Sequence, residues 1–347
     1  MTLLVELMPV PFIVTANVAV GKPWGSGATA MLGGFFVSLL ALSGFADMLG
    51  LPLLSPALSP QSRFGLDAGL VVTAAAAAGF LIRPIRKDVS TIISIDPDNP
   101  VHTMALILAT ALLGVNVSLL VFTDVLAAAS AQPPLTVLDL FEEQLPAFIA
   151  GVVGVGIFIR RDAAPGASRL GVVRPAWWHI VLALACTGVF VGIAQALGTL
   201  GEMLTPTVAN HVETTTDHLF GQLVSNPAGV VAIALIPAVC EEVLFRGAIQ
   251  PRLGVIVTAM LFTSIHTQYA LSFDTLAIFV FALGLGLLRK YTNTTASFIS
   301  HSTYNLLTAI GITGAVLDAA LAAEAVLVAV SAYAIWAERK RRASATD

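Results

Sequence analysis

Apolar residues gather in long segments that recur along the whole chain and are separated by short polar stretches. Each segment holds about 15–25 residues, the length that an α-helix needs to cross a hydrocarbon core about 30 Å thick. The pattern predicts an all-α polytopic membrane helical bundle of about ten transmembrane helices. The predicted spans are residues 27–46, 66–83, 101–126, 138–159, 176–198, 226–248, 253–270, 274–289, 295–312 and 314–337.

Residues 1–20 are also apolar, but Pro9 and Pro11 interrupt them. Proline removes a backbone donor and disfavours a continuous helix, so this segment is predicted to lie at the membrane interface. A first membrane span is the alternative. The segment lacks the positively charged region that begins a cleaved signal peptide.

Lysine and arginine are concentrated in alternate loops of the predicted bundle. Cytoplasmic loops of membrane proteins carry an excess of these residues, so we predict that these loops face the cytoplasm. The opposite loops contain acidic residues and Arg63 as their one basic exception. This asymmetry predicts a multi-pass protein of the cell membrane with a cytoplasmic C-terminus. The basic residues are Lys22, Arg83, Arg86, Lys87, Arg160, Arg161, Arg169, Arg174, Arg252, Arg289, Lys290, Arg339, Lys340, Arg341 and Arg342.

Composition agrees with a membrane protein and argues against several other classes. Charged residues make up 11% of the chain and the mean hydropathy is +0.89, whereas a soluble domain is about 25% charged. A net charge of -4 without a basic, aromatic patch indicates no nucleic-acid partner. No Walker A or dinucleotide-binding sequence is present, so no nucleotide partner is predicted. Cys186 and Cys240 both fall in predicted spans, which argues against a disulfide framework.

Ionisable residues interrupt the apolar sequence PAVCEEVLFRGAIQ, which covers residues 237–250. A charge near the bilayer centre costs about 2.5–3.5 kcal/mol on insertion scales, so charges in such a segment are expected to serve a function. On a helix Glu242 and Arg246 are four positions apart and can pair on one face. Glu241 is rotated away by about 100° and is free to point elsewhere. Pro237, one turn earlier, is predicted to kink the helix.

Two later segments complete a polar constellation drawn from three predicted spans. LFTSIH ends at His266, and SHSTYN contains His301 and Asn305. A carboxylate and a histidine can hold and deprotonate a water molecule, and a second histidine and an amide can donate to an oxyanion. Together these side chains supply the catalytic groups that hydrolysis of an amide requires. Two histidines and a carboxylate are also a zinc-ligand set, so Glu241, His266 and His301 are the candidate ligands of a possible zinc ion.

The three motifs EEVLFR, FTSIH and HSTYN resemble the EExxxR, FxxxH and HxxxN signature of the CAAX-protease and bacteriocin-processing (CPBP) intramembrane protease family. Type II CAAX prenyl endopeptidases belong to that family, and the resemblance covers roughly residues 169–310. It implies an endopeptidase that cleaves near the cytoplasmic membrane face. Its partners would be the lipid bilayer and a CAAX-type, leader, lipid-modified or membrane-anchored peptide or protein.

The resemblance also implies a role for each site residue. Glu241 would be the general base on the attacking water, which His266 would help to position. Glu242 would orient the site through its ion pair, and His301 and Asn305 would form the oxyanion hole. The family is described both as metalloproteases and as metal-free glutamate proteases, and the sequence leaves both open. No HExxH sequence is present, which argues against a zinc protease of the site-2 type.

The predicted spans place the site residues at different depths in the membrane. Glu241 and His301 would lie about 10 Å from the cytoplasmic ends of their spans, at 1.5 Å per residue. His266 would lie about 20 Å into its span if that helix begins at Gly254. We therefore expect the helix that carries His266 to start deeper or to tilt.

A loop rich in Arg, Gly, Pro and Ala divides the chain at residues 160–175. We predict N-terminal transmembrane helices without a recognised motif over residues 1–165 and a CPBP-like catalytic membrane core over residues 166–312. Residues 313–347 are predicted to form the final transmembrane helix and a basic cytoplasmic tail.

Two other functions use the same features. A non-catalytic membrane protein for binding, immunity or scaffolding could carry the same fold and polar cluster. A transporter would show an inverted repeat, and the first half of the chain holds no second copy of the polar motifs. A second pair of glutamates, Glu142 and Glu143, has Ala147 where an arginine would be needed and is interpreted as interfacial.

Overall fold

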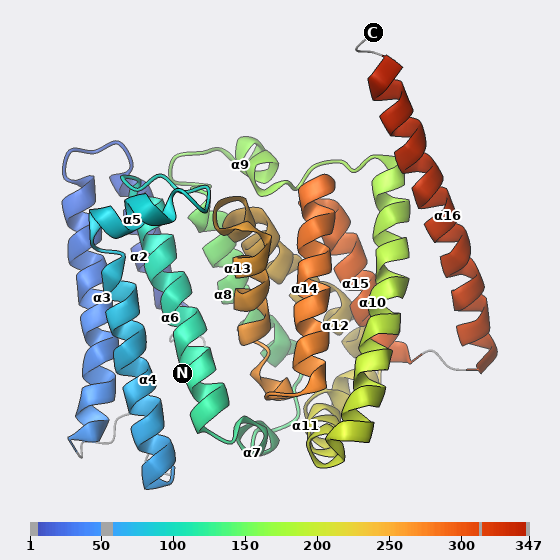
Figure 1. Ribbon diagram of the computed structural model, residues 1–347, viewed down its shortest axis with the longest axis horizontal. Coiled ribbons are helices and arrows are strands. Elements are labelled where there is room, and N and C mark those ends of the chain that lie inside the picture. Colours follow the sequence, from blue (N-terminus) through green and yellow to red (C-terminus); the bar gives the residue numbers. More distant parts are fainter. Residues whose placement is uncertain (1–5, 50–57, 312–313, 345–347) are drawn as a thin grey trace.

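The computed structural model describes residues 6–49, 58–311 and 314–344, which form a bundle of helices without a strand (Figure 1). The prediction of an all-α bundle is confirmed for these residues. The helices in chain order are α2 (Pro9–Ala19), α3 (Gly25–Met48), α4 (Pro60–Gly79), α5 (Arg83–Val89), α6 (Pro100–Phe122), α7 (Val125–Ser130), α8 (Val137–Gly154), α9 (Ala163–Leu170), α10 (Trp177–Leu204), α11 (Pro206–Val224), α12 (Pro227–Glu241), the π-helix η1 (Glu242–Ile249), α13 (Gln250–Ser264), the 3₁₀ turn η2 (Thr267–Tyr269), α14 (Phe273–Tyr291), α15 (Thr294–Ile310) and α16 (Gly314–Ser344).

Every predicted span is occupied by a helix, but the helices differ in length. Within the described ranges, five helices are long and apolar enough to cross a membrane, or up to six if α4 and α5, bent by 86°, form one broken span. One of the five is the continuous stretch Pro227–Ser264, which comprises α12, η1 and α13. The protein is therefore an integral multi-pass membrane protein, and the total of ten spans stays a prediction.

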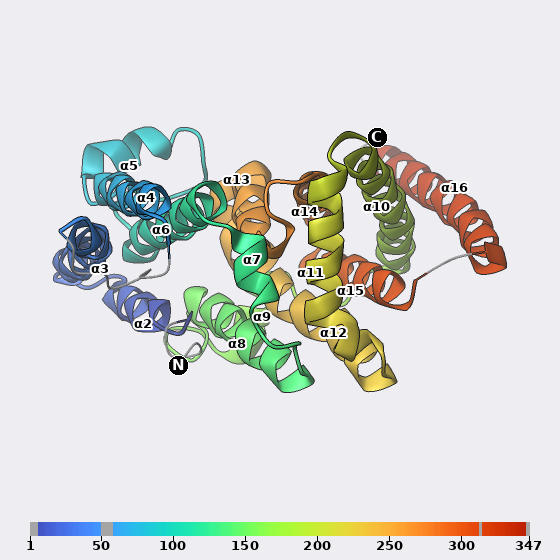
Figure 2. The same ribbon diagram turned by 90° about the horizontal axis from the view of Figure 1, so that it is seen from below.

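The proline-interrupted start of the chain forms the short helix α2, and residues 1–5 of the predicted interfacial segment lie outside the described ranges. α2 has 11 residues, fewer than a membrane span requires. It lies beside α3 and α8 (Figure 2) and also packs against α6. Phe12 and Ala16 of α2 are buried. Asn17 of α2 donates from Nδ2 to the Val153 carbonyl oxygen over 3.0 Å, so this segment is part of the bundle wall.

The two ends of the bundle differ in charge. The basic helices α5 and α9 and the C-terminal end of α16 lie at one end, at the top of Figure 1, whereas α7 and α11 lie at the other. At the basic end, Arg83 forms an exposed ion pair of 2.7 Å with Asp98. The structure thus gathers the predicted cytoplasmic loops on one side of the bundle.

Asparagine caps fix the starts of the two helices that carry most of the predicted site. The Asn226 side chain accepts from the Gly229 backbone N–H over 2.8 Å at the start of α12, just before Pro227. Asn293 accepts from the Ala296 backbone N–H over 2.9 Å at the start of α15. Such caps satisfy backbone donors that a helix start leaves unpaired, and proline is favoured directly after them because it has no donor.

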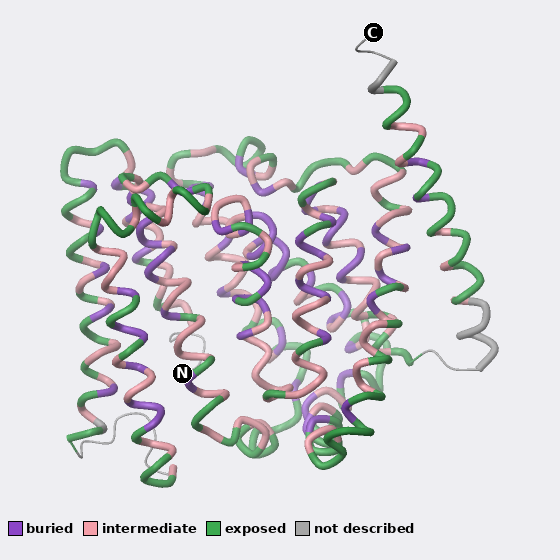
Figure 3. Tube along the Cα trace, in the orientation of Figure 1, coloured by how far each residue is buried: buried purple, intermediate pink, exposed green. Residues whose placement is uncertain are grey.

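The buried residues lie in the middle of the bundle (Figure 3). The largest buried cluster is aromatic and aliphatic, and it includes Phe245, Phe262, Phe281 and Leu285 from η1, α13 and α14. The peripheral helix α16 exposes apolar side chains such as Leu321 and Val326, as a helix surrounded by lipid does. The helices that carry the polar motifs are therefore central, and the outer helices present apolar side chains to the surroundings.

Gly254 breaks the helical path within α13, with φ 81° and ψ 174°. Residues with a side chain avoid this region at a cost of about 1–3 kcal/mol. Nothing lies within 4 Å of the position that a Cβ atom would take at Gly254, so backbone strain alone should decide the effect. We expect Gly254→Ala to lower the free energy of unfolding by about 1–3 kcal/mol, measured by thermal unfolding in detergent.

A second glycine provides the matched control for this variant. Gly192 lies inside α10 and also has open space around its Cβ position. Gly192→Ala should leave the protein as stable as before or stabilise it by up to about 1 kcal/mol, because alanine favours a helix. An equal response of the two variants would contradict the strain that we assign to Gly254.

Candidate active site

The glutamate motif lies where α12 widens into the π-helix η1. α12 continues through Pro237 to Glu241, and η1 then runs from Glu242 to Ile249. π-helical turns are rare, occur mostly as short bulges inside α-helices, and are frequent at functional sites. The break in regular α-helix therefore falls at the two glutamates.

Glu242 and Arg246 form an ion pair inside the protein. Their side chains are 1% and 0% exposed, and Arg246 Nε lies 3.5 Å from Glu242 Oε2. The Arg246 guanidinium also stacks over the Phe262 ring at 4.5 Å and donates to the Ala282 carbonyl oxygen over 3.5 Å. A buried charge requires such a partner, because an unpaired charge in this environment is strongly unfavourable.

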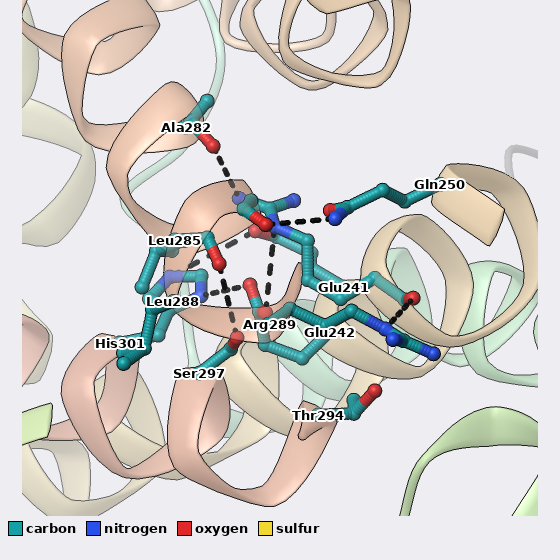
Figure 4. A network of polar contacts seen from close by, with 12 residues as sticks. Glu241, Glu242, Gln250, Ala282, Leu285, Leu288, Arg289, Thr294, Ser297 and His301 are labelled. Atoms are coloured by element: carbon teal, nitrogen blue, oxygen red, sulfur yellow. Dashed lines mark hydrogen bonds and ion pairs between the residues drawn. The ribbon is translucent and has the colours of Figure 1, made fainter. Parts of the chain in front are cut away.

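His301 of α15 connects this ion pair to the other glutamate (Figure 4). Its Nδ1 lies 3.1 Å from Glu242 Oε1, and its Nε2 lies 3.9 Å from Glu241 Oε2. The Phe281 ring packs edge-on against the imidazole with ring centroids 5.2 Å apart, and His301 is 3% exposed. One imidazole thus bridges two carboxylates that belong to the same turn of helix.

Glu241 faces a large cavity, whereas Glu242 does not. The cavity has a volume of about 1630 Å³, and its walls include Glu241, His266, His301 and Asn305. Neither Glu242 nor Arg246 is among the lining residues. Glu241 is 3% exposed, and its Oε2 has no hydrogen-bond partner within the described part of the chain. Buried polar atoms are almost always hydrogen-bonded, so this oxygen lacks an acceptor's usual partner beside a cavity that its residue lines.

His266 reaches the cavity from a turn and not from the middle of a helix. The predicted span of residues 253–270 ends as a helix at Ser264, and His266 directly precedes the 3₁₀ turn η2. Its Nδ1 lies 2.8 Å from the Phe262 carbonyl oxygen. The Phe262 ring lies between the two histidines, with its centroid 4.7 Å from His266 and 5.9 Å from His301. His266 therefore lines the same cavity as Glu241 and His301 from a turn that follows α13, and its depth in the membrane stays a prediction.

Asn305 lies one turn after His301 on α15 and also lines the cavity. Its Nδ2 donates to the carbonyl oxygen of Ile233 in α12 over 3.3 Å. An amide nitrogen carries two hydrogens, so this bond leaves one donor for a ligand.

Two tyrosines beside these groups were not singled out by the sequence reasoning. Tyr269 stacks on His266 with centroids 6.4 Å apart, and Tyr304 stacks on Phe281 at 4.4 Å. Both tyrosines line the cavity. Tyr304 lies inside the HSTYN motif, and Tyr269 follows His266 by three positions, so their places beside the motifs were the available signal.

The N-terminal region contributes to the same cavity. Phe36 of α3 and Met104 and Leu108 of α6 line it together with the residues of α12, α13 and α15. The N-terminal helices, which carry no recognised motif, therefore form an apolar wall that faces the polar groups. A division of the chain near residue 165 separates two parts that enclose one cavity.

The candidate zinc ligands do not form a metal site as they stand. Among the described residues, no three or more His, Cys, Asp or Glu side chains are grouped so that they could hold a metal ion. Glu241, His266 and His301 line one cavity, and Nδ1 of each histidine has the protein partner given above.

In the comparison with known protein families, residues 223–307 match the model described as Type II CAAX prenyl endopeptidase Rce1-like. The match contains all six candidate site residues and extends from the end of α11 into α15. No curated protein sequence and no solved structure matches the chain. Through residues 223–307 of its 347 residues, the chain is similar to the Rce1-like type II CAAX prenyl endopeptidases.

Proposed function

We propose that the protein is an intramembrane endopeptidase that hydrolyses a peptide bond near the cytoplasmic membrane face, in a prenylated or otherwise membrane-anchored substrate. One observation carries this proposal. Glu241 lines a cavity of about 1630 Å³ together with His266 and His301, and its buried carboxylate oxygen Oε2 has no hydrogen-bond partner among the described residues. A carboxylate within reach of water and of a bound carbonyl group is what general-base hydrolysis requires.

The proposed reaction uses water as the nucleophile. Glu241 removes a proton as the water oxygen bonds to the carbonyl carbon of the scissile peptide, and His266 helps to position the water. The carbonyl oxygen then becomes an oxyanion, which accepts hydrogen bonds from His301 Nε2 and Asn305 Nδ2. The C–N bond breaks, and the proton passes from Glu241 to the leaving nitrogen. The products are a carboxylic acid and an amine, and Glu241 is a carboxylate again.

Glu242 would hold His301 in place and would not touch the substrate. The Glu242 carboxylate accepts from His301 Nδ1, and Arg246 balances its charge from the other side. In the imidazolium form, His301 donates from both ring nitrogens, to Glu242 and to the oxyanion. Fixing the donor before the reaction lowers the reorganisation needed when charge develops on the substrate.

The walls of the cavity support a lipid-modified substrate. Apolar side chains from α3 and α6 face the polar groups across the cavity, and a hydrocarbon chain would be buried among them. The basic loops gathered at one end of the bundle support a cytoplasmic entrance there. The peptide bond of an anchored tail would then meet Glu241 just inside the membrane.

The two ring nitrogens of His301 give the first test of these roles. His301→Asn keeps a donor at the Nδ1 position for Glu242 but has no group at the Nε2 position, whereas His301→Ala removes both. We expect both variants to lose at least about 100-fold in kcat, because each lacks the oxyanion donor. Only His301→Ala should also lose stability, by about 1–3 kcal/mol, because it leaves the buried Glu242 oxygen unpaired. Cleavage rates and thermal unfolding of the two proteins check this.

The proposal as a whole is tested with purified protein in lipid vesicles and a prenylated peptide. We expect mass spectrometry to show one new carboxyl terminus and one new amino terminus per cleaved chain. Tight binding of the peptide without any cleavage would favour the second candidate, a binding or immunity protein. Equal cleavage by wild type and His301→Ala protein would reject the catalytic set.

A further inference from the structure

Four arginines line the cavity at the basic end of the bundle. Arg160 and Arg161 lie in the connection between α8 and α9, Arg169 lies in α9, and Arg252 lies in the first turn of α13. Arg160 is exposed, so the cavity reaches the surface here, whereas the other three are half-buried. We call these four side chains the arginine cluster. None of them belongs to the polar motifs that carry the proposed reaction.

The arginine cluster has no acidic partner among the described residues. The hydrogen bonds of three members go to neutral groups. Arg160 Nε donates to the Asn17 amide oxygen over 2.8 Å, Arg161 donates to the Val155 carbonyl oxygen, and Arg252 donates to the Ser94 carbonyl oxygen over 3.3 Å. Arg169 has neither a hydrogen bond nor an ion pair in the part of the chain that the structure describes.

The four charges lie close enough to repel one another. Burial lowers the pKa of Arg169, and the nearby charges of Arg252, Arg161 and Arg160 lower it further. A guanidinium stays charged in proteins despite such shifts. Half-buried positive charges without a counterion are unfavourable, and a bound anion would remove the penalty. The cluster therefore has the electrostatics of an anion-binding site that opens into the cavity.

The cluster lies within reach of the proposed general base. Arg252 follows Glu241 by eleven positions along a continuous helical path. At 1.5 Å per residue these positions span about 16 Å, and an arginine side chain shortens the gap. An extended peptide rises about 3.3 Å per residue, so about three to five residues would connect a bond at Glu241 to an anion at the cluster.

We propose that the arginine cluster binds the C-terminal carboxylate of the peptide substrate. This inference rests on the proposed protease function and adds a recognition element to it. Arginine forms paired, charge-assisted hydrogen bonds with a carboxylate. The cluster lines the same cavity as Glu241, which favours the end of a substrate chain over a lipid headgroup on the outer surface.

The test measures binding and not cleavage, so that it does not depend on the reaction. Glu241→Gln protein is placed in phosphatidylcholine nanodiscs, and the Kd is measured for a prenylated peptide that ends in a free carboxylate or in an amide. We expect the carboxylate peptide to bind about tenfold more tightly. Arg169→Gln and Arg252→Gln, each added singly, should remove this preference. Arg174→Gln should keep it, because Arg174 is exposed and does not line the cavity.

Three outcomes would overturn the inference. One is equal affinity of the two peptides for the Glu241→Gln protein that keeps all four arginines. This measurement is valid even if the arginine variants do not fold. Another is an equal loss of affinity for both peptides in the arginine variants. A third is loss of the preference for the carboxylate peptide when phosphatidylglycerol is added, which would assign the cluster to anionic headgroups.

Cleavage by the wild type without a carboxylate preference would reject the carboxylate site alone. A preference without cleavage would reject the protease proposal alone.

Discussion

Replacing Glu241 with glutamine is expected to reduce kcat for a prenylated peptide by at least about 100-fold, because an amide cannot accept the proton of the attacking water. The change keeps the shape of the side chain. Glu241 Oε2 has no hydrogen-bond partner among the described residues, so little folding energy should be lost. The melting temperature should stay close to that of the wild type. Rates in lipid vesicles and thermal unfolding in detergent measure the two effects separately.

The chain supplies a matched control for this variant. Glu142 belongs to the other glutamate pair, at the start of α8, where it is exposed and does not line the cavity. Glu142→Gln makes the same chemical change and should leave kcat within about twofold of the wild type. If Glu241→Gln and Glu142→Gln both retain full activity, Glu241 is not the base.

Replacing Arg246 with methionine is expected to have the largest effect on stability. Arg246 is 0% exposed, and its removal takes the permanent positive charge away from the buried Glu242 carboxylate, which keeps only His301 Nδ1 beside it. Breaking a buried pair on one side costs about 3–5 kcal/mol, whereas replacing both partners with uncharged groups is often close to neutral. We expect Arg246→Met to lower the free energy of unfolding by that amount, measured by denaturant titration in micelles.

The double variant separates the ion pair from the packing around it. Adding Glu242→Gln to Arg246→Met removes the unpaired charge and should restore most of the lost stability. A double-mutant cycle of the wild type, the two single variants and the double variant is expected to give an interaction energy of about 2–3 kcal/mol in favour of the pair. The double variant should still be inactive, because His301 no longer has the Glu242 carboxylate beside Nδ1. Additive losses would show that Arg246 acts through its packing on Phe262 alone.

The local features of the chain were predictable because short-range chemistry decides them. Apolar segments of membrane length became helices, and the asparagine–proline starts of helices such as α12 follow from backbone donors that need a partner. The pairing of Glu242 with Arg246 follows from their spacing on one turn. The motifs also indicated the family, and the family comparison bears this out.

Other features depend on parts of the chain that are far apart, and sequence patterns do not contain them. His266 lies in a turn after a shortened helix, and the break at Gly254 became visible only in the backbone path. The position of His301 between the two glutamates depends on how α15 packs against α12 and η1.

The sequence by itself determined that this protein is a helical membrane protein and which polar groups it places within the apolar segments. Only the tertiary structure decided which of those groups face a shared space. The apolar wall from α3 and α6 and the arginine cluster both line the cavity that Glu241 faces, although most of their residues lie outside the motif-bearing segment. The physical reason is that helix packing brings together surfaces from distant segments, and the identity of a residue does not encode its neighbours across a cavity.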